Sequence, residues 1–495
     1  MTVLLGWNGA GKSNLIEALA VLFRDVDLAE VPSFPCAITY FCRNHRIELD
    51  ARQREAQQIR VLIDGEPISF HNFASEDGRK YRPAYVFGYY SGPSNRLEEH
   101  FERHQQLFYE DLLANKPRPL RRLFYARPVH SQFVLLSFFS DPARKRQKFL
   151  KEFLGIETLD SVLFVIREPP WRQPRPSPQV RKEGDSRFWY ARGTVKGFLD
   201  RLYQTALAPL RLNLRTAIEF RKFKTLEHVY LFLRDNEDLV RLAGDYESEA
   251  EFFKTLESTY ISKLLAEVRI RVRIRNVDGS LTFRELSEGE QQLITVLGLL
   301  EFTKEHESLF LLDEPDTHLN PSWSMQYLEL LKRVVKDSDH SHIIMATHDP
   351  LVLSDLLRSQ VQVLRNDRRA RRITAEKPDD DPRGMGVAGI LTSDMFGLRT
   401  TVGLKTQRLL DEKRGLGAKK KLSKREKARL QELNEDLAGL GFATSFRDPL
   451  FERFTKALLS DYDQELFEKP ILTKTEQAHQ QRVVDRIVAK LKQKL

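Results

Sequence analysis

The chain alternates between short apolar runs and longer amphipathic stretches, a pattern typical of proteins that mix strands and helices. Thr2 to Leu5 is apolar, Gly6 to Gly11 is rich in glycine, and Lys12 to Phe23 has apolar residues at helical spacing. These segments predict a strand, a loop and a helix in that order. Leu309 to Leu312 and Ile343 to Ala346 have the length of short buried strands. The pattern therefore predicts an α/β protein.

The segments between these runs complete the predicted architecture. Alternating residues from Ile47 to Phe70 predict antiparallel strands. Residues 95–165 and 194–267 have a mainly helical pattern, and the proline-rich stretch 168–193 between them predicts a loop and an internal boundary. Val268 to Arg275 alternates strictly between apolar residues and arginine, which predicts a half-buried strand. Its arginines either pair with carboxylates of a neighbouring strand or face nucleic acid.

Composition and charge narrow the class of protein. With 41% hydrophobic and 30% charged residues among 495, the chain has the profile of a folded protein. Cys36 and Cys42 are its two cysteines, and their spacing fits neither a disulfide framework nor a zinc ribbon, so we expect a reducing cytoplasm. The apolar runs are shorter than the roughly 18 residues that span a bilayer, and no membrane span or secretion signal is expected.

The net charge of +9 is concentrated in one segment. Lys405 to Arg429 contains eleven basic and three acidic residues, so the rest of the chain is nearly neutral. Such a segment either neutralises phosphates of DNA or RNA or forms a solvated helix surface. The sequence leaves both interpretations open.

The loop Gly6-Trp7-Asn8-Gly9-Ala10-Gly11-Lys12-Ser13 fits the phosphate-binding pattern G-x-x-x-x-G-K-S/T. It also has the strand before it and the helix after it that this pattern requires. Backbone N–H groups along such a loop converge on phosphate oxygens, while the lysine reaches the β and γ phosphates and the hydroxyl ligates Mg²⁺. The predicted nucleotide-binding residues are Asn8, Gly9, Ala10, Gly11, Lys12 and Ser13.

Polar residues follow the two downstream strands. Asp313 and Glu314 come directly after Leu309 to Leu312, and two carboxylates at a strand end suit a site for metal and phosphate. There Asp313 would bind Mg²⁺ and Glu314 would polarise the attacking water. His348 follows Ile343 to Ala346, which places it near the same nucleotide.

A fourth segment, Leu286-Ser287-Glu288-Gly289-Glu290, precedes an apolar helix. Read locally, it is a Ser-capped helix start, which is also an anion site.

These four segments in this order resemble the ATP-binding-cassette type of ATPase, in its RecF, SMC and OLD-like branch. Leu286 to Glu290 matches the signature L-S-x-G-E/Q of that family, and Asp313 to Pro321 matches D-E-P-x-x-H-L-x-P. The resemblance implies an ATPase with ATP and Mg²⁺ as cofactors and a head-to-tail homodimer, in which Ser287 and Gly289 of one subunit close on the γ-phosphate bound by the other. It implies Glu314 and His348 as catalytic residues, and Ser13 and Asp313 as metal ligands.

The implied fold is an α/β phosphate-loop ATPase head with a mixed sheet, flanking helices, a helical insertion and a helical C-terminal region. We expect an N-terminal ATPase lobe (1–94), the insertion (95–267), a C-terminal ATPase lobe (268–376) and a basic, partner-docking region (377–495). The family has strands ahead of the phosphate loop, whereas here the loop begins at residue 6, so either the start of the chain is misplaced or one edge of the sheet is missing. Gln132 is the candidate for the family's glutamine loop.

Two features indicate the branch of the family. The separation from Lys12 to Ser287 is too short for the coiled-coil arm of an SMC protein. The acidic run Asp379-Asp380-Asp381 follows no apolar strand, so we expect no metal-dependent nuclease site in this chain. Gly389 to Thr400 and Tyr89 to Arg96 resemble PtuA-type ATPases of Septu-type and retron-associated anti-phage systems. That resemblance implies a separate HNH nuclease, PtuB, as partner. The alternatives are a RecF-like DNA-repair clamp and a structural ATPase scaffold.

Overall fold

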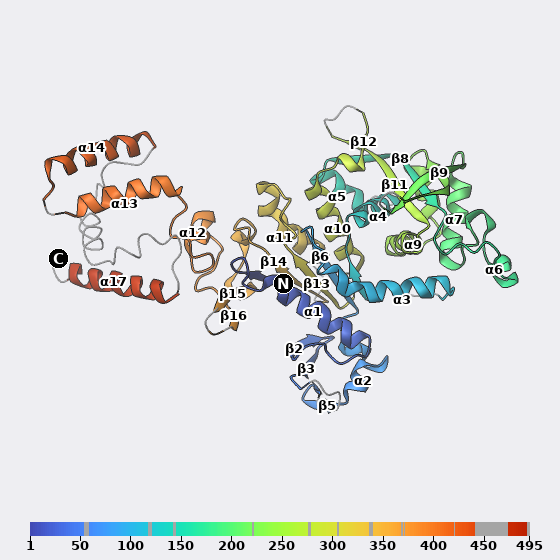
Figure 1. The fold of residues 1–495 in the computed structure, drawn as a ribbon, viewed down its shortest axis with the longest axis horizontal. Coiled ribbons are helices and arrows are strands. Elements are labelled where there is room, and N and C mark those ends of the chain that lie inside the picture. The colour runs from blue at the N-terminus through green and yellow to red at the C-terminus, as the bar shows by residue number, and fades with distance from the viewer. Residues whose placement is uncertain are drawn as a thin grey trace. The chain divides into compact units, whose positions relative to one another are not determined.

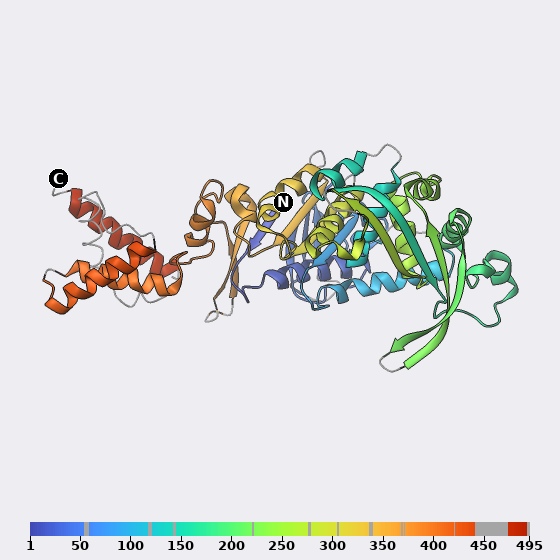
Figure 2. The same cartoon turned by 90° about the horizontal axis from the view of Figure 1, so that it is seen from above.

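The computed structural model of the chain describes residues 1–53, 59–116, 121–141, 145–219, 222–275, 279–303, 306–335, 340–367, 370, 372–419, 421–440 and 474–492. Figures 1 and 2 show the ribbon from two directions. The chain forms two compact units, Met1–Leu4 with Gly11–Val352 and Leu5–Ala10 with Leu353–Leu495. This division falls after Val352, whereas the sequence-based boundary falls after residue 376.

A parallel sheet forms the centre of the first unit. Its strands follow one another in space in the order β1 (Thr2–Leu5), β14 (Ser341–Ala346), β13 (Ser308–Asp313), β6 (Tyr85–Tyr90) and β7 (Leu123–Tyr125). Each neighbouring pair runs parallel. Every residue of β13 is buried, as expected for a strand in the middle of a sheet covered on both faces. The residues that follow these strands therefore gather along one edge of the sheet.

Helix α1 (Lys12–Asp27) packs against β13 and β14 of this sheet. Its Leu22 and Val26 also enter a second core with an antiparallel sheet and α2 (Phe70–Ala74). The four strands of this sheet are β2 (Ala37–Cys42), β3 (His45–Asp50), β4 (Arg60–Ile63) and β5 (Glu66–Ile68). The prediction of antiparallel strands in this region is confirmed.

The expectation of a mainly helical segment from 95 to 267 is wrong in part. The helices α3 (Glu102–Leu113), α4 (Pro128–Ser140), α5 (Lys145–Phe153), α7 (Gly193–Thr205), α8 (Asn236–Ala243) and α9 (Glu249–Ile261) are present. The same segment also contains long strands, namely β8 (Ile156–Arg167), β9 (Leu210–Glu219) and β10 (Lys222–Leu233). They join β11 (Leu265–Ile274) and β12 (Leu281–Thr282) in a five-stranded antiparallel sheet of order β12-β11-β8-β10-β9.

The reason for this error is the long-range pairing of β8. It lies between β10 and β11, which satisfy its backbone on both sides. Such partners lie far away in sequence, so local periodicity does not reveal them. Figure 2 shows β9 and β10 as a long hairpin at the end of this sheet, drawn in green.

Strand β11 has the predicted alternation. Arg273 pairs with Asp160 of β8 at 3.2 Å, and Arg269 pairs with Glu267 at 2.9 Å. The interpretation that these arginines pair with carboxylates of a neighbouring strand is therefore confirmed for Arg273, whereas the partner of Arg269 lies in β11 itself. The buried positions between them are Val268, Ile270 and Val272.

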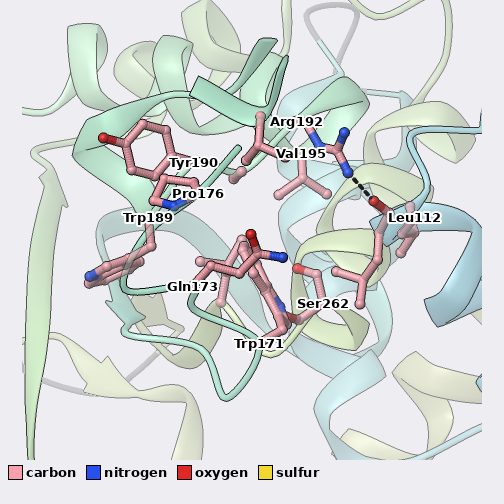
Figure 3. A pocket seen from close by; sticks show the side chains of 13 residues that line it. Leu112, Trp171, Gln173, Pro176, Trp189, Tyr190, Arg192, Val195 and Ser262 are labelled. Atoms are coloured by element: carbon pink, nitrogen blue, oxygen red, sulfur yellow. Dashed lines mark hydrogen bonds between the residues drawn. The ribbon is translucent and has the colours of Figure 1, made fainter. Parts of the chain in front are cut away.

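The proline-rich stretch 168–193 does not separate compact units, because it is fastened to the body of the first unit. The indole nitrogen of Trp171 donates to the carbonyl oxygen of Ser262 at 2.6 Å, and the Arg192 guanidinium donates to the carbonyl oxygen of Leu113. These contacts lie beside a cavity of about 110 Å³ whose lining includes Trp171, Gln173 and Val195 (Figure 3). The stretch includes the short helix α6 (Pro178–Glu183).

The second unit contains the antiparallel strands β15 (Val361–Asp367) and β16 (Arg372–Glu376). Its helices are α12 (Gly386–Thr392), α13 (Leu404–Ala418), α14 (Lys424–Gly439) and α17 (Lys474–Lys492), which confirms a helical C-terminal region. Helices α13 and α14 lie side by side (Figure 1), joined by the Arg429–Glu412 ion pair at 2.8 Å. Among the helices described, none is both long and apolar enough to cross a membrane.

A buried cluster of three charged or ionisable side chains connects the segment before β7 with α4 and α9. Glu257 accepts hydrogen bonds from the Arg121 guanidinium and, at 2.9 Å, from the His130 ring. None of the three side chains is more than 3% exposed. Burial acts to raise the pKa of Glu257, but the charges of His130 and Arg121 outweigh it and lower the pKa to about 2.

We predict that Glu257→Gln destabilises the protein by about 3–5 kcal/mol, because it leaves the buried Arg121 guanidinium without a counter-charge. The free energy of unfolding is measured by urea denaturation. Glu110→Gln, at an exposed position of α3, is the control and should change stability by less than about 0.5 kcal/mol. Equal losses in the two variants would contradict the prediction.

Candidate nucleotide-binding site

The loop from Gly6 to Ser13 joins β1 to α1 and has the backbone of a tight glycine turn. Gly6, Gly9 and Gly11 have φ values of 149°, 81° and 95°, in the region that favours glycine. A Cβ atom on Gly6 would lie 2.7 Å from the carbonyl oxygen of Leu364 in β15. Asn366 of β15 donates to the carbonyl oxygen of Gly9 at 2.9 Å. Strand β15 therefore braces the loop, in which Asn8 is exposed and Ala10 is buried.

Lys12 and Ser13 begin α1 and interact with the residues that end β13. The Ser13 hydroxyl hydrogen-bonds the Asp313 carboxylate. Lys12 is buried, and its burial lowers the pKa of its amine more than the nearby charges of Glu314 and Asp313 raise it. Burial raises the pKa of Asp313, against the hydrogen bond from Ser13. The structure thus brings these four predicted residues together, and their roles in catalysis stay predictions.

The Asp313 carboxylate suits a metal ion. Its Oδ1 atom is buried and has no hydrogen-bond partner among the described residues. Such an oxygen costs free energy, and a hard cation would satisfy it. Mg²⁺ is commonly bound by one or two protein oxygens together with substrate phosphates, so Asp313 and Ser13 fit it. In the described ranges no group of three or more His, Cys, Asp or Glu forms a separate metal site, and Asp379, Asp380 and Asp381 are exposed.

Glu314 adopts an uncommon backbone conformation beside His348. Its φ is 52°, a left-handed value that residues with a side chain rarely adopt and that is often found at functional sites. The backbone N–H of Glu314 donates to the carbonyl oxygen of Ala346 at 2.9 Å. His348 Nδ1 lies 3.4 Å from Glu314 Oε1, so the two predicted catalytic side chains meet.

Sequence reasoning missed the role of Asp316. This buried carboxylate accepts a hydrogen bond from the Thr347 hydroxyl, whose oxygen in turn accepts the backbone N–H of Asp349 at 2.9 Å. The segment around His348 is thereby fixed to the segment after β13. Burial raises the pKa of Asp316 to about 6. The sequence feature that could have indicated this role is a third carboxylate within the string Asp313-Glu314-Pro315-Asp316.

Ser287 caps helix α10 (Glu288–Thr303) as predicted. The backbone N–H of Ser287 donates to the Glu290 carboxylate at 2.6 Å, and the N–H of Glu290 donates to the Ser287 hydroxyl at 3.3 Å. A Cβ on Gly289 would lie 2.6 Å from the carbonyl oxygen of His318, so glycine permits a close approach here. These hydrogen bonds of Ser287 stay within the cap, and the approach of a nucleotide to Ser287 and Gly289 stays a prediction.

Gln132 lies in α4, half-buried, and follows β7. Strand β7 is not next to β13, because β6 lies between them. The strand that neighbours β13 directly is β6, and the loop that follows β6 begins after Tyr90. Ser91 in that loop donates its N–H to the carbonyl oxygen of Asp313 at 3.3 Å. Ser91 is a second residue that sequence reasoning missed. The sequence feature that could have indicated Ser91 is its place in a polar turn directly after an apolar strand.

Comparison with known families agrees with this geometry. Residues 1–354 match the family described as "AAA domain, putative AbiEii toxin, Type IV TA system". The chain belongs to this AAA domain family. Its ABC-type phosphate loop and strand-end carboxylates are the features of an ATP-binding ATPase.

Two relatives share parts of this AAA-domain protein. It is 28% identical to Septu protein PtuA of Bacillus mycoides over 30% of its own length and 22% of the relative. It is 33% identical to protein ea59 of Escherichia phage lambda over 22% of its own length and 20% of the relative. The matches thus span about a fifth of each relative. The SMC head domain of Thermotoga maritima aligns over 76% of this chain and 90% of its own, with 11% identity and a TM-score of 0.29.

We predict that Asp316→Asn stabilises this AAA-domain protein more at about pH 8 than at about pH 4.5. Above the folded-state pKa of about 6, folding must bury a charged carboxylate, and this cost is largest there. As the pH falls towards the unfolded-state pKa of about 4 the cost shrinks, because the folded carboxyl is already protonated and the unfolded one increasingly is. The gain at the higher pH should be about 1–3 kcal/mol. Urea denaturation at both pH values measures it, with the exposed Asp380→Asn as control. A difference between Asp316→Asn and the parent that does not change with pH would contradict the argument.

Proposed function

We propose that the chain is the ATP-binding and ATP-hydrolysing subunit of a cytoplasmic anti-phage defence complex, in which it controls a separate HNH nuclease. The meeting of Lys12, Ser13 and Asp313 with Glu314 and His348 carries the ATPase part of this proposal. The similarity to Septu protein PtuA supports the defence part. The HNH partner is proposed as a PtuB-like protein, and the chain itself is proposed not to be a nuclease.

The side chains divide the work of hydrolysis. Lys12 would neutralise charge on the β and γ phosphates, because its amine is buried beside the site. Ser13 and Asp313 would hold Mg²⁺, which neutralises phosphate charge when bound. Glu314 would orient the attacking water and accept its proton, with His348 fixing the carboxylate from 3.4 Å.

The active form is proposed to be a homodimer with ATP between the subunits, with higher oligomers built from it. Ser287 and Gly289 at the start of α10 would contact the partner subunit's nucleotide through the helix N-terminus and the closely approaching backbone.

The HNH protein is proposed to bind the C-terminal region. In the described part of that region Leu404 and Leu440 are 65% and 57% exposed. The other apolar residues proposed for this contact are Phe396, Leu398, Phe442, Phe446, Phe451 and Phe454, of which the last four lie outside the described residues. Nucleic acid is a further proposed ligand of the basic segment, although Lys419 and Arg429 already pair with Glu426 and Glu412.

We predict that Glu314→Gln keeps ATP bound but slows its hydrolysis by roughly 10²–10⁴-fold, the loss expected when a general base is removed. The trapped complex should be dimeric by light scattering. Lys12→Ala is the matched control, and it should lose ATP binding, measured by equilibrium binding of labelled nucleotide. Unchanged affinity in a folded Lys12→Ala variant, or a monomeric Glu314→Gln with saturating ATP while the parent dimerises, would contradict the shared site.

We predict that the purified full-length chain degrades no DNA with Mg²⁺, because its described residues hold no cluster of metal-binding side chains for that chemistry. Nuclease activity should appear when an HNH protein encoded beside it is added and the two co-purify. Replacing the exposed Leu404 with Asp should weaken this co-purification, whereas nucleotide binding should not change. DNA cleavage by the chain alone, or tight DNA binding at physiological salt without any nuclease partner, would favour a nuclease or the RecF-like alternative.

A further inference from the structure

Arg96 lies in the loop that follows β6, the strand next to β13. Its guanidinium is fixed to helix α1. Nη2 donates to Asn14 Oδ1 and to Glu17 Oε2, both at 2.8 Å, and Nε donates to the other carboxylate oxygen of Glu17. Asn14 directly follows Ser13 and Glu17 lies one helical turn after it, so Arg96 is held beside the start of α1.

The position of Arg96 leaves part of its guanidinium accessible. Its side chain is 42% exposed, and Nη1 makes no hydrogen bond to the residues that the structure describes. Arg96 also lies near enough to Asp313 for its positive charge to lower the pKa of that carboxyl, against the larger effect of burial. The guanidinium of Arg96 is thus held in place near Ser13 and Asp313, with the N–H groups of Nη1 available to a ligand.

Structural stabilisation alone explains this arrangement poorly. An exposed arginine–carboxylate pair contributes only about 0–1 kcal/mol to folding. The guanidinium fork, by contrast, binds phosphate oxygens with defined geometry. Asn14 and Glu17 hold Nη2 and Glu17 holds Nε, which reduces the entropy lost when Nη1 binds an anion.

We propose that Arg96 binds the terminal phosphate of the nucleoside triphosphate through Nη1 and so distinguishes ATP from ADP. This inference rests on the proposed ATPase function and adds a binding residue to the same site. Lys12 would contact both the β and γ phosphates, whereas Arg96 would add its charge only when the γ-phosphate is present. Glu17 and Asn14 are then positioning residues that fix the direction of the guanidinium.

Isothermal titration calorimetry with the full-length protein tests the proposal, using Mg²⁺ with a non-hydrolysable ATP analogue and, separately, with ADP. We predict that Arg96→Ala weakens binding of the analogue about 10-fold or more, as expected for one lost charge-assisted hydrogen bond, and changes ADP affinity less than about 2-fold. Arg96→Gln should behave like Arg96→Ala, and Arg96→Lys should recover part of the selectivity. Arg46→Ala is the matched control, because Arg46 is 49% exposed and paired with Glu48 in β3.

Two results would overturn the proposal while leaving the ATPase function intact. One is unchanged selectivity for the analogue over ADP in Arg96→Ala and Arg96→Gln. The other is an equal loss of affinity for both nucleotides, which would mean that Arg96 supports the loop and does not read the γ-phosphate. If the parent protein binds neither nucleotide, the proposed function and this inference both fail.

Discussion

The candidate site depends on the register of the parallel sheet. Leu4 and Asp313 both pair with Ala346, and Asp313 also pairs with Tyr90, so the ends of four strands stand in one row. Asp313 lies in this row, and the phosphate loop, Glu314, His348 and the loop that contains Arg96 come just after it. A slip of one residue in any strand would turn its side chains to the opposite face of the sheet. The hydrogen bonds of the sheet therefore fix the relative positions of the candidate site residues.

The same row concentrates charge where water is partly excluded. Lys12 and Asp313 are both buried, and burial shifts the pKa of each toward its neutral form. Asp313 also has a buried carboxylate oxygen with no hydrogen-bond partner among the described residues, and Glu314 has a left-handed backbone; both raise the free energy of this region. Phosphate and Mg²⁺ would supply partners for these groups and so lower the free energy of the protein. This is the physical basis for treating the group as a ligand site and not as an ordinary salt bridge.

Supporting contacts hold the surrounding segments to this row. Asp316 fixes the segment of His348 through Thr347, and Gly289 lets the start of α10 approach the backbone of His318. Strand β15 braces the phosphate loop and belongs to the same compact unit as the helices of the C-terminal region. Substitutions of these supporting residues are therefore expected to disturb the site, although they lie outside the predicted nucleotide contacts.

The sequence by itself determined the α/β class, the phosphate loop with its flanking strand and helix, and the strand ends that present Asp313, Glu314 and His348. These features are local, because each motif and its supporting element lie within about twenty residues. The strands β8, β9 and β10 were read as helix because their pairing partners are distant in the chain. The contacts of Asp316 and Arg96 likewise form only in the folded chain, since Thr347, Asn14 and Glu17 come from other elements. Tertiary structure decided these points because hydrogen-bond partners and burial are fixed by long-range packing and not by local pattern.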